Sequence, residues 1–370
     1  MSDFGYIGCA MTQTTFIPNT EAPAPPPVNQ KSVYVIFNPV SGKSDPEERK
    51  KVISDALAAH GYTCQFIATT KEQGAKACAA EALALGADLL AVSGGDGTVM
   101  EAMSALVGKD IPIAVFPAGT GNLLSVNLGI PTTVPDAVDV ALGGQMYSLD
   151  LARVGDGRYF AIMGGLGMDA QMIKDSGREA KDRLGKLAYF LAAVKNLPRR
   201  RAHVEIILDD RPPLQRRVKS VLLANMGKIT GGLDAMPTAS PNDGLLDIGI
   251  LKASTPADWV FLMANALLGR AQQDRSLEVY QARKVTLRPR RPQPVQFDGE
   301  DAGTMDELTI EMVPKAVRVL IPRDAPGTQE ARDLPPAVVA ERSAKRRLLL
   351  PLALLLLAVG AALAWRRRKP

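Results

Sequence analysis

The chain has 370 residues, of which 46% are hydrophobic and 22% are charged. This length exceeds what one ordinary hydrophobic core needs, so we expect two globular domains with tails, and the composition excludes a chain that is disordered throughout. It contains only three cysteines, without CxxC spacing, and two histidines. These counts argue against a zinc site and indicate a reducing compartment.

The net charge of +5 is unevenly distributed along the chain. Eight Arg or Lys residues and one acid lie from Glu341 onward, so this end carries +7 and residues 1–340 carry −2. The basic residues form two clusters, 342–347 and 366–369, which flank an uncharged apolar segment at 348–365. Because the clusters adjoin an apolar segment, we expect them to contact anionic lipid headgroups and not nucleic acid.

The apolar segment 348–365 predicts a C-terminal hydrophobic helix that anchors the protein to the cell membrane. As a helix it would be about 27 Å long, close to the hydrocarbon thickness of a bilayer. Pro351 leaves open whether it spans the bilayer or lies in the inner leaflet. No secretory signal peptide is evident at the N-terminus.

Two proline-rich stretches delimit the folded body. Four prolines lie between Pro23 and Pro27, and a second such stretch begins at Ile321. Such stretches are typical of stiff, unpaired linkers. We therefore expect five segments: a disordered N-terminus at 1–30, an α/β domain at 31–145, a mainly-β domain at 146–322, a linker with basic residues at 323–347 and the membrane helix at 348–365.

Strand and helix signals alternate in the first half of the body. Asp45 and Pro46 predict the start of a helix that Gly61 ends. Further helices are expected before Gly86 and after the sequence GGDGT. Strands are expected at 33–37, 64–68, 88–92 and 113–116. This alternation favours an α/β fold with a parallel sheet.

Three glycine-containing loops leave the carboxyl ends of these strands. They are NPVSGK (38–43), SGGDGT (93–98) and PAGTGN (117–122). Ligands of parallel α/β sheets bind beyond these strand ends, and glycine lets a phosphate approach backbone N–H groups closely. One such loop could be a plain turn, whereas three at one sheet edge favour a polyphosphate site.

The second half contains short β-like runs separated by Gly, Pro and Asp turns. This pattern predicts a mainly-β sandwich or barrel, interrupted by helices around 182–196 and 256–269. We expect this domain to face the glycine-containing loops across a cleft.

The ordered motifs NPVSGK, SGGDGTVMEAM, FPAGTGNLLSVNLGIP, GGLGMDA, NDGLLDIGIL and FDGE resemble the diacylglycerol kinase catalytic superfamily, which also contains sphingosine and ceramide kinases. The resemblance covers about residues 31–322. It implies a two-domain, Mg²⁺-dependent enzyme that transfers the γ-phosphate of ATP to a lipid hydroxyl, with its kinase domains on the cytoplasmic side. Met100 and Leu123 depart from the common family pattern. Because Leu123 is closer to the sphingosine and ceramide branch, the lipid stays open.

The resemblance also implies roles for individual residues. Asp96 would organise its loop or hold the Mg²⁺ that neutralises charge on the transferred phosphate, and is therefore a catalytic candidate. Lys43 could add a cation near the phosphates. The ATP-binding positions would be Asn38, Pro39, Val40, Ser41, Gly42, Thr70, Gly94, Gly95, Asp96, Gly97, Thr98 and Thr120.

Two further positions follow from the same resemblance. Glu300 in FDGE matches the general base, which would take the proton of the lipid hydroxyl, with Asp298 in a supporting role; the alternative is a plain β-turn. A second, structural Mg²⁺ would be bound by the Asp243 carboxylate with Ser240 and Leu245, because oxygen-only ligands suit a hard cation. The alternative there is a hairpin turn.

Two other functions remain open: an NAD kinase-like enzyme with a soluble substrate, and a non-catalytic lipid-binding protein on the same fold. The hydrophobic tail and the DGE motif disfavour the first, and the intact GGDGT with Glu300 disfavours the second. The sequence does not reveal whether the chain forms a homodimer.

Overall fold

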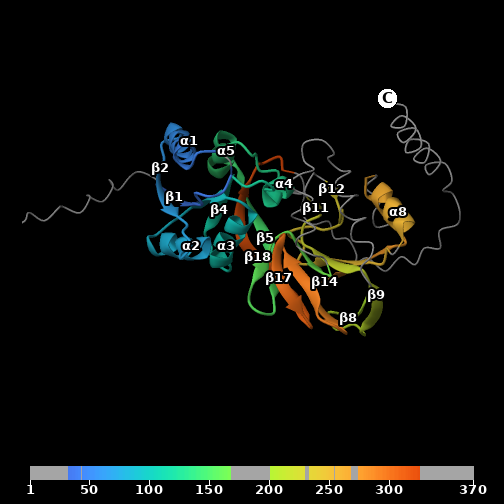
Figure 1. Ribbon diagram of the computed structural model, residues 1–370. Helices are drawn as coiled ribbons and strands as arrows, with labels where there is room; N and C mark the ends of the chain where they lie inside the picture. Colours follow the sequence, from blue (N-terminus) through green and yellow to red (C-terminus); the bar gives the residue numbers. More distant parts are fainter. Residues whose placement is uncertain are drawn as a thin grey trace, which may run out of the picture. The chain divides into compact units, whose positions relative to one another are not determined.

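The computed structural model describes residues 32–42, 44–167, 201–229, 233–253, 255–267 and 274–325. These residues form two compact units (Figure 1). Unit 1 contains the described residues up to Leu149 and returns at Lys315–Ala325, and unit 2 contains those between Asp150 and Pro314.

Unit 1 is built on a parallel sheet, as the sequence predicts. Each strand pairs with its neighbours in parallel register, in the order β2-β1-β3-β4-β18. The strands are β1 (Ser32–Phe37), β2 (Thr63–Ala68), β3 (Leu90–Gly94), β4 (Pro112–Pro117) and the C-terminal part of β18 (Leu308–Ile321).

Five helices accompany this sheet: α1 (Pro46–Ala59), α2 (Ala75–Ala84), α3 (Asp96–Leu106), α4 (Leu123–Leu128) and α5 (Val134–Gly143). Asp45 caps α1 by accepting hydrogen bonds from the N–H groups of Glu47 and Glu48, which confirms the predicted start. The sequence analysis did not predict α4 or α5. The signal for α5 was available, since Pro135 and Asp136 lie in its first turn.

The helices cover both faces of the sheet. On one face, alternate residues of β1 pack with α1 and α5, in a core that includes Val35, Phe37, Leu57 and Val138. On the other face α2 packs against α3 (Figure 1). Since both faces are covered, the strand ends with their loops are the part of the sheet left open to a ligand.

Unit 2 is a sandwich of antiparallel sheets, which confirms the predicted mainly-β domain. One sheet has the order β14-β13-β10-β7-β16-β17, and the other contains β9, β8, β15 and the first part of β18, with β5 and β6 beside it. Residues of both sheets, among them Ile206, Leu223, Ile248 and Leu287, form one buried core. The bounds are β5 (Gln145–Val154), β6 (Tyr159–Phe160), β7 (Met163–Leu166), β8 (Ala202–Leu208), β9 (Leu214–Val218), β10 (Ser220–Ala224), β13 (Leu246–Leu251), β14 (Leu277–Ala282), β15 (Lys284–Pro289), β16 (Gln293–Phe297) and β17 (Glu300–Met305).

The described residues of unit 2 also form a short hairpin and a helix. A short hairpin pairs β11 (Lys228–Ile229) with β12 (Leu233–Asp234). The helix expected around 256–269 is present as α8 (Pro256–Leu267). The helix expected around 182–196 lies outside the described residues.

The chain crosses between the units within two strands, β5 and β18. The segment predicted as the second domain, 146–322, contains unit 2, and its residues from Lys315 onward group with unit 1 by their contacts. β18 is a continuous strand of 14 residues, and its local sequence pattern cannot reveal that its first part pairs with β15 of unit 2 and its last part with β4 of unit 1.

The predicted segments 1–30 and 348–365, and nearly all of 323–347, lie outside the described residues. Among the helices that the structure describes, none has the length and apolar character needed to cross a bilayer. The anchor at 348–365 is not one of these helices and stays a prediction.

The returning segment is fixed at the end of α5. Arg323 Nε donates to the carbonyl of Gly143 at 2.9 Å, and Gln145 Nε2 donates to the carbonyl of Pro322 at 3.1 Å. Between them Gly144 packs so closely that a Cβ would collide with the carbonyl oxygens of Ile321 and Val140.

We expect Gly144→Ala to destabilise unit 1 by about 1–3 kcal/mol, because the backbone of Ile321 must move to make room. Gly143→Ala is the matched control, since a Cβ there meets nothing within 4 Å. Chemical denaturation of both variants checks this. Equal stability of the two would contradict the close packing.

Candidate active site

The loop after β1 is tied to the start of α3. Asn38 Nδ2 donates to Thr98 Oγ1 at 2.8 Å, and its backbone N–H donates to the carbonyl of Ser93 at 2.9 Å. Asn38 Oδ1 accepts from the N–H of Val40 at 3.1 Å and so turns the loop. The structure thus brings the predicted positions Asn38 to Gly42 next to Thr98.

Arg49 of α1 holds the same loop from behind. It is buried, with 5% of its surface exposed, and its guanidinium lies 4.4 Å from the centre of the Phe37 ring. It donates to the carbonyl oxygens of Ser41 and Asn38, the latter at 2.5 Å. Burial lowers the pKa of Arg49. The sequence analysis missed this residue, although its spacing from Ile53 and Leu57 places it on the buried side of α1.

The glycines of GGDGT allow a close approach at the start of α3. A Cβ on Gly94 would lie 2.6 Å from the Thr98 Cβ, and a Cβ on Gly119 would lie 2.7 Å from the Gly95 Cα. Gly95 is the N-cap of α3, and no side chain caps this end. The first N–H groups of α3 therefore lack a side-chain acceptor, which is the arrangement that binds phosphate at helix N-termini. Gly97 lies within this first turn.

The loop after β4 contacts both of the other loops. The N–H of Ala118 donates to the carbonyl of Gly94 at 2.9 Å. Gly42, at φ +86°, lies so close to Ala118 that a Cβ would be 2.6 Å from its carbonyl oxygen. Asn122 adopts a left-handed conformation, and its Oδ1 is buried with no partner in the described residues. The three predicted loops therefore form one cluster, which we call the loop cluster (residues 38–42, 93–98 and 117–122).

Asp96 has a structural contact within the loop cluster. Its Oδ1 accepts from the N–H of Leu124 at 3.2 Å, at the start of α4. Its Oδ2 lies 3.0 Å from the position of a Cβ on Gly121. Glu101, one turn further along α3, caps α2 in the same way by accepting from the N–H of Ala75 at 2.9 Å. Asp96 therefore positions the third loop against α3.

Two predicted threonines lie at the edge of this region. Thr70 Oγ1 accepts from the N–H groups of Glu72 and Gln73, at 3.2 and 3.0 Å, and shapes the turn after β2. Thr120 is exposed in the loop after β4. Lys43 lies outside the described residues.

Glu300 begins β17 directly after a tight turn. The two turn residues, Asp298 and Gly299, have φ angles of 48° and 85°, as in the hairpin turns that favour Asp-Gly, and Phe297 pairs with Glu300. The backbone thus follows the β-turn alternative. The Glu300 side chain is exposed and has no hydrogen bond or ion pair among the described residues.

Asp298 fixes this turn to the rest of unit 2. Its carboxylate accepts three backbone N–H bonds, from Ala161, Ile162 and Met163, each at 2.9 Å. Its own N–H donates to the carbonyl of Met163 at 2.9 Å. Asp298 therefore supports the position of Glu300 structurally. Glu300 lies in unit 2 and Asp96 in unit 1, so the two catalytic candidates do not share a unit.

The candidate metal positions lie in one loop of unit 2. Asp243 Oδ1 accepts from the N–H of Leu245 at 2.9 Å, and Ser240 Oγ donates to Asn242 Oδ1 at 3.0 Å. Burial raises the pKa of Asp243 to about 6, and the nearby Asp247 and Asp150 carboxylates add to this rise. Within the described ranges no three His, Cys, Asp or Glu side chains form a metal-binding group. A cation here would depend on one carboxylate with carbonyl oxygens, and it would relieve the cost of ionising Asp243.

Comparison with known proteins agrees with this arrangement. Residues 32–154 match the diacylglycerol kinase catalytic domain, and residues 164–321 match the YegS C-terminal NAD kinase beta sandwich-like domain. A diacylglycerol kinase of Bacillus subtilis is 28% identical over 299 residues, which cover 80% of this chain and 97% of that protein. A diacylglycerol kinase of Mycobacterium tuberculosis is 29% identical, with 79% and 95% covered.

The fold is also shared with a solved structure. A diacylglycerol kinase of Bacillus anthracis superposes with a TM-score of 0.62 at 21% identity, covering 80% of this chain and 98% of that one. At this identity the likeness concerns the fold alone. The two matched domains lie in the order and over the residues that carry the loop cluster and the FDGE turn. The chain therefore contains a diacylglycerol kinase catalytic domain followed by a YegS C-terminal NAD kinase beta sandwich-like domain.

Proposed function

We propose that this protein is a lipid kinase that transfers the γ-phosphate of ATP to the hydroxyl of a membrane lipid, which is diacylglycerol, a long-chain base such as sphingosine, or ceramide. The observation that carries the proposal is the loop cluster: three strand-end loops of unit 1 contact one another around a helix N-terminus that no side chain caps. The names of the relatives support the lipid acceptor.

The loop cluster fits a nucleotide phosphate chain. The N–H groups at the start of α3 offer hydrogen-bond donors, and the missing side chains of Gly94 and Gly119 let the backbone pack closely around them. Bound Mg²⁺ would neutralise charge that develops on the transferred phosphate. Asp96 is the candidate for holding it, through the carboxylate oxygen that does not accept from Leu124.

Glu300 is the proposed general base. A primary alcohol loses its proton as its oxygen attacks phosphorus, so a carboxylate near that oxygen lowers the barrier. The exposed Glu300 side chain could accept this proton without first breaking an existing ion pair. Asp298 would position it through the three bonds to residues 161–163.

The location of the protein follows from its substrates. A lipid acceptor requires contact with the membrane, and ATP is cytosolic, so we propose that the kinase domains lie on the cytoplasmic side of the cell membrane. The apolar segment 348–365 and its two basic clusters would keep the enzyme at the bilayer and contact anionic headgroups.

One assay tests the proposal and serves the variants below. The purified full-length protein is incubated in lipid–detergent micelles with labelled ATP, Mg²⁺ and separate acceptors: diacylglycerol, sphingosine, ceramide and NAD. We expect label in one of the lipids. Label in NAD would replace the proposal with an NAD kinase. Lipid binding without transfer to any acceptor would replace it with a non-catalytic lipid-binding protein.

We expect Asp96→Asn to lower turnover by about 10²-fold or more, because the amide keeps the oxygen that accepts from Leu124 but loses the charge that would hold Mg²⁺. Glu101→Gln makes the same change in the same helix, at a carboxylate that caps α2, and should retain activity. Thermal unfolding of both variants should resemble wild type. Near-normal turnover of Asp96→Asn would remove Asp96 from the mechanism.

We expect Glu300→Gln to reduce turnover by about 10²-fold with little change in the KM for ATP, because the amide preserves size and turn geometry but cannot accept a proton. Asp301→Asn, at the next exposed carboxylate, should leave turnover unchanged. If both variants turn over like wild type, Glu300 is only part of the turn.

The raised pKa of Asp243 gives a test of the second Mg²⁺ site. Because the folded protein holds this proton more tightly than the unfolded chain does, its stability falls as the pH rises from about 4 through about 6. We expect Mg²⁺ to raise the melting temperature near pH 7, where it replaces the proton, and to have little effect near pH 5.

The matching variant is Asp243→Asn, which has no charge to bury. It should melt higher than wild type near pH 7 without metal and should not respond to Mg²⁺, whereas Asp301→Asn should respond like wild type. If Mg²⁺ does not change the melting temperature of the wild-type protein near pH 7, residues 240–245 are only a hairpin turn.

A further inference from the structure

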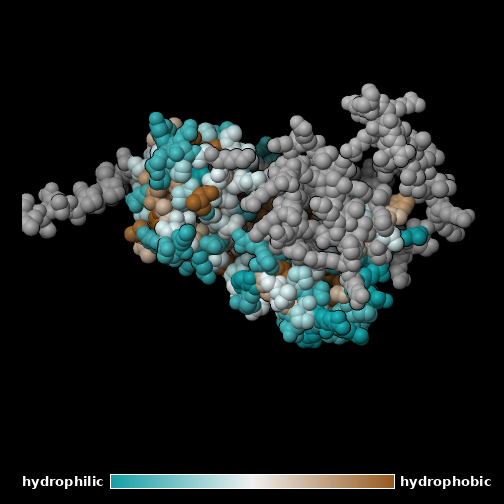
Figure 2. Space-filling model, viewed as in Figure 1, coloured by the Kyte–Doolittle hydropathy of each residue, from teal (hydrophilic) through white to brown (hydrophobic). Residues whose placement is uncertain are grey.

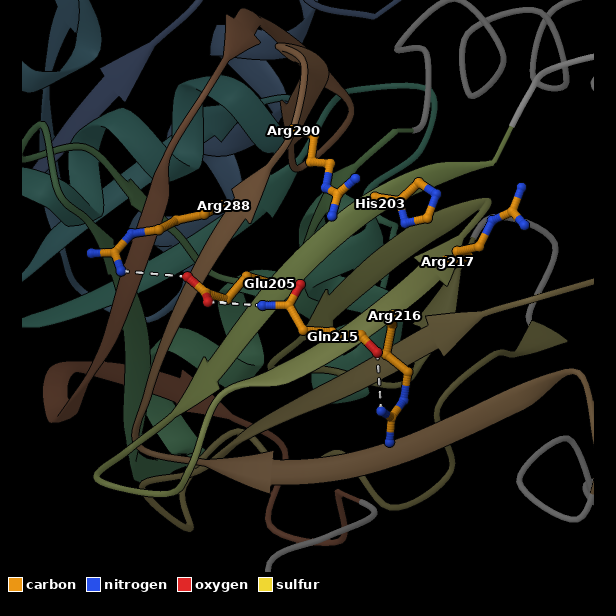
Figure 3. Close-up of a pocket in the computed structure, with 7 residues that line it drawn as sticks. All are labelled: His203, Glu205, Gln215, Arg216, Arg217, Arg288 and Arg290. Carbon is orange, nitrogen blue, oxygen red and sulfur yellow. Dashed lines mark hydrogen bonds and ion pairs between the residues drawn. The ribbon is translucent and has the colours of Figure 1, made fainter.

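Unit 2 contains a cationic pocket that the kinase reaction does not use. Its volume is about 460 Å³, and four arginines, one histidine, one glutamine and one glutamate line it (Figure 3). Most of these residues lie on β8, β9 and β15 or directly after them. On β8, Val204 and Ile206 point into the core of the sandwich, so the alternate residues His203 and Glu205 lie on the opposite face.

Three of the lining residues form a row across the strands, which we call the cationic row (Arg217, His203 and Arg290). His203 of β8 pairs directly with Arg217 of β9. The N–H of Arg290, one residue past β15, donates to the carbonyl of His203 at 2.9 Å. Figure 3 shows the His203 ring between the two arginine side chains. Since neighbouring strands are about 4.8 Å apart, the two arginines start about 10 Å apart, on either side of His203.

The next row on the same face consists of Arg288, Glu205 and Gln215, and in it the arginine is paired with acids. Arg288 contacts Glu307 at 2.9 Å and Glu205 at 3.6 Å, and Glu205 also accepts from Gln215 at 2.8 Å. Arg216, the fourth arginine of the pocket, pairs with Glu278 at 3.0 Å.

The cationic row has no such acid. All three side chains are exposed, and neither Arg217 nor Arg290 contacts a carboxylate among the residues that the structure describes. Arg291, also exposed, adds a further cation beside Arg290. Positive charge on neighbouring strands that no acid neutralises opposes folding. An anion that binds there would supply the missing negative charge.

The chemistry of the row fits a phosphate group. Each guanidinium presents a planar set of donors that can bond two phosphate oxygens, and the imidazole between them offers a further polar atom. The visible surface over β8 and β9 is largely hydrophilic (Figure 2), as expected for an electrostatic contact rather than for insertion of apolar side chains. The pocket volume exceeds the volume of a single phosphate, so the pocket has room for the group to which the phosphate is attached.

We propose that Arg217, His203 and Arg290 form a binding site for a phosphate group, supplied either by a lipid headgroup at an anionic membrane surface or by a soluble phosphate. The site goes beyond the proposed kinase reaction. Because its test measures binding in the absence of ATP, its failure and the failure of the kinase proposal are distinguishable.

The test compares two variants of the full-length protein. Arg217→Gln/Arg290→Gln removes both arginines of the cationic row. The control Arg283→Gln/Lys284→Gln removes the same charge from two exposed side chains at the other end of β15, six residues from Arg290 and so about 20 Å away. All four side chains are exposed, so neither variant should melt lower than wild type. The wild type and both variants keep the C-terminal basic clusters, so the contribution of these clusters to binding is the same in all three proteins.

Two readouts distinguish the sources. In the first, the proteins are floated with phosphatidylcholine vesicles that contain or lack phosphatidylglycerol. We expect the cationic-row variant to bind the anionic vesicles about 30-fold more weakly at low salt, since each cation near such a surface contributes about fivefold. In the second, inorganic phosphate is titrated into each protein by calorimetry.

Loss of vesicle binding in the cationic-row variant alone supports the site with a lipid headgroup as its ligand. Loss of the phosphate titration in that variant alone, with vesicle binding unchanged, supports the site with a soluble phosphate. The proposal is overturned if both readouts are unchanged in the cationic-row variant, or if the control variant loses as much binding.

Discussion

The close backbone approach among three loops is the constraint on which the candidate site depends. Gly42 and Gly119 lie so near a neighbouring loop that a Cβ would collide with Ala118 and with Gly95, respectively. The hydrogen bonds from Asn38 to Thr98 and from Ala118 to Gly94 hold this contact without adding bulk. Glycine carries an entropic cost in ordered structure, and under the proposed function this cost is balanced by access of the nucleotide phosphates to backbone N–H groups.

Carboxylates in both units act first as acceptors for backbone N–H groups. Asp96 accepts at the start of α4, Glu101 at the start of α2, and Asp298 from residues 161–163. Such contacts orient loops, which is also what catalysis requires of groups near a reacting phosphate. A variant that tests a catalytic role of such a carboxylate must therefore keep its hydrogen bond to the backbone. An amide does this, because it retains the accepting oxygen.

The sequence predicts most of what is local. The alternation of strands and helices, the cap at Asp45 and the turn at Asp298–Gly299 depend on residues close together in the chain. Arg49 and the return of β18 to unit 1 were not predicted, because each depends on partners far along the chain. Asp96 was predicted either to organise its loop or to hold Mg²⁺, but its hydrogen-bond partner, the N–H of Leu124, lies 28 residues away and could not be derived from the motif. The cationic row was missed for the same reason, since its members come from three strands.

The return of β18 has a consequence for how the protein is made. Residues 315–325 complete the sheet of unit 1, whereas its other strands lie before Leu149. A ribosome releases the first strands long before it releases their last neighbour, and until then the edge of β4 lacks the partner that Arg318 and Val319 provide. Open strand edges are sites of wrong pairing between chains. Unit 1 therefore reaches its final form only when nearly the whole folded body has been synthesised.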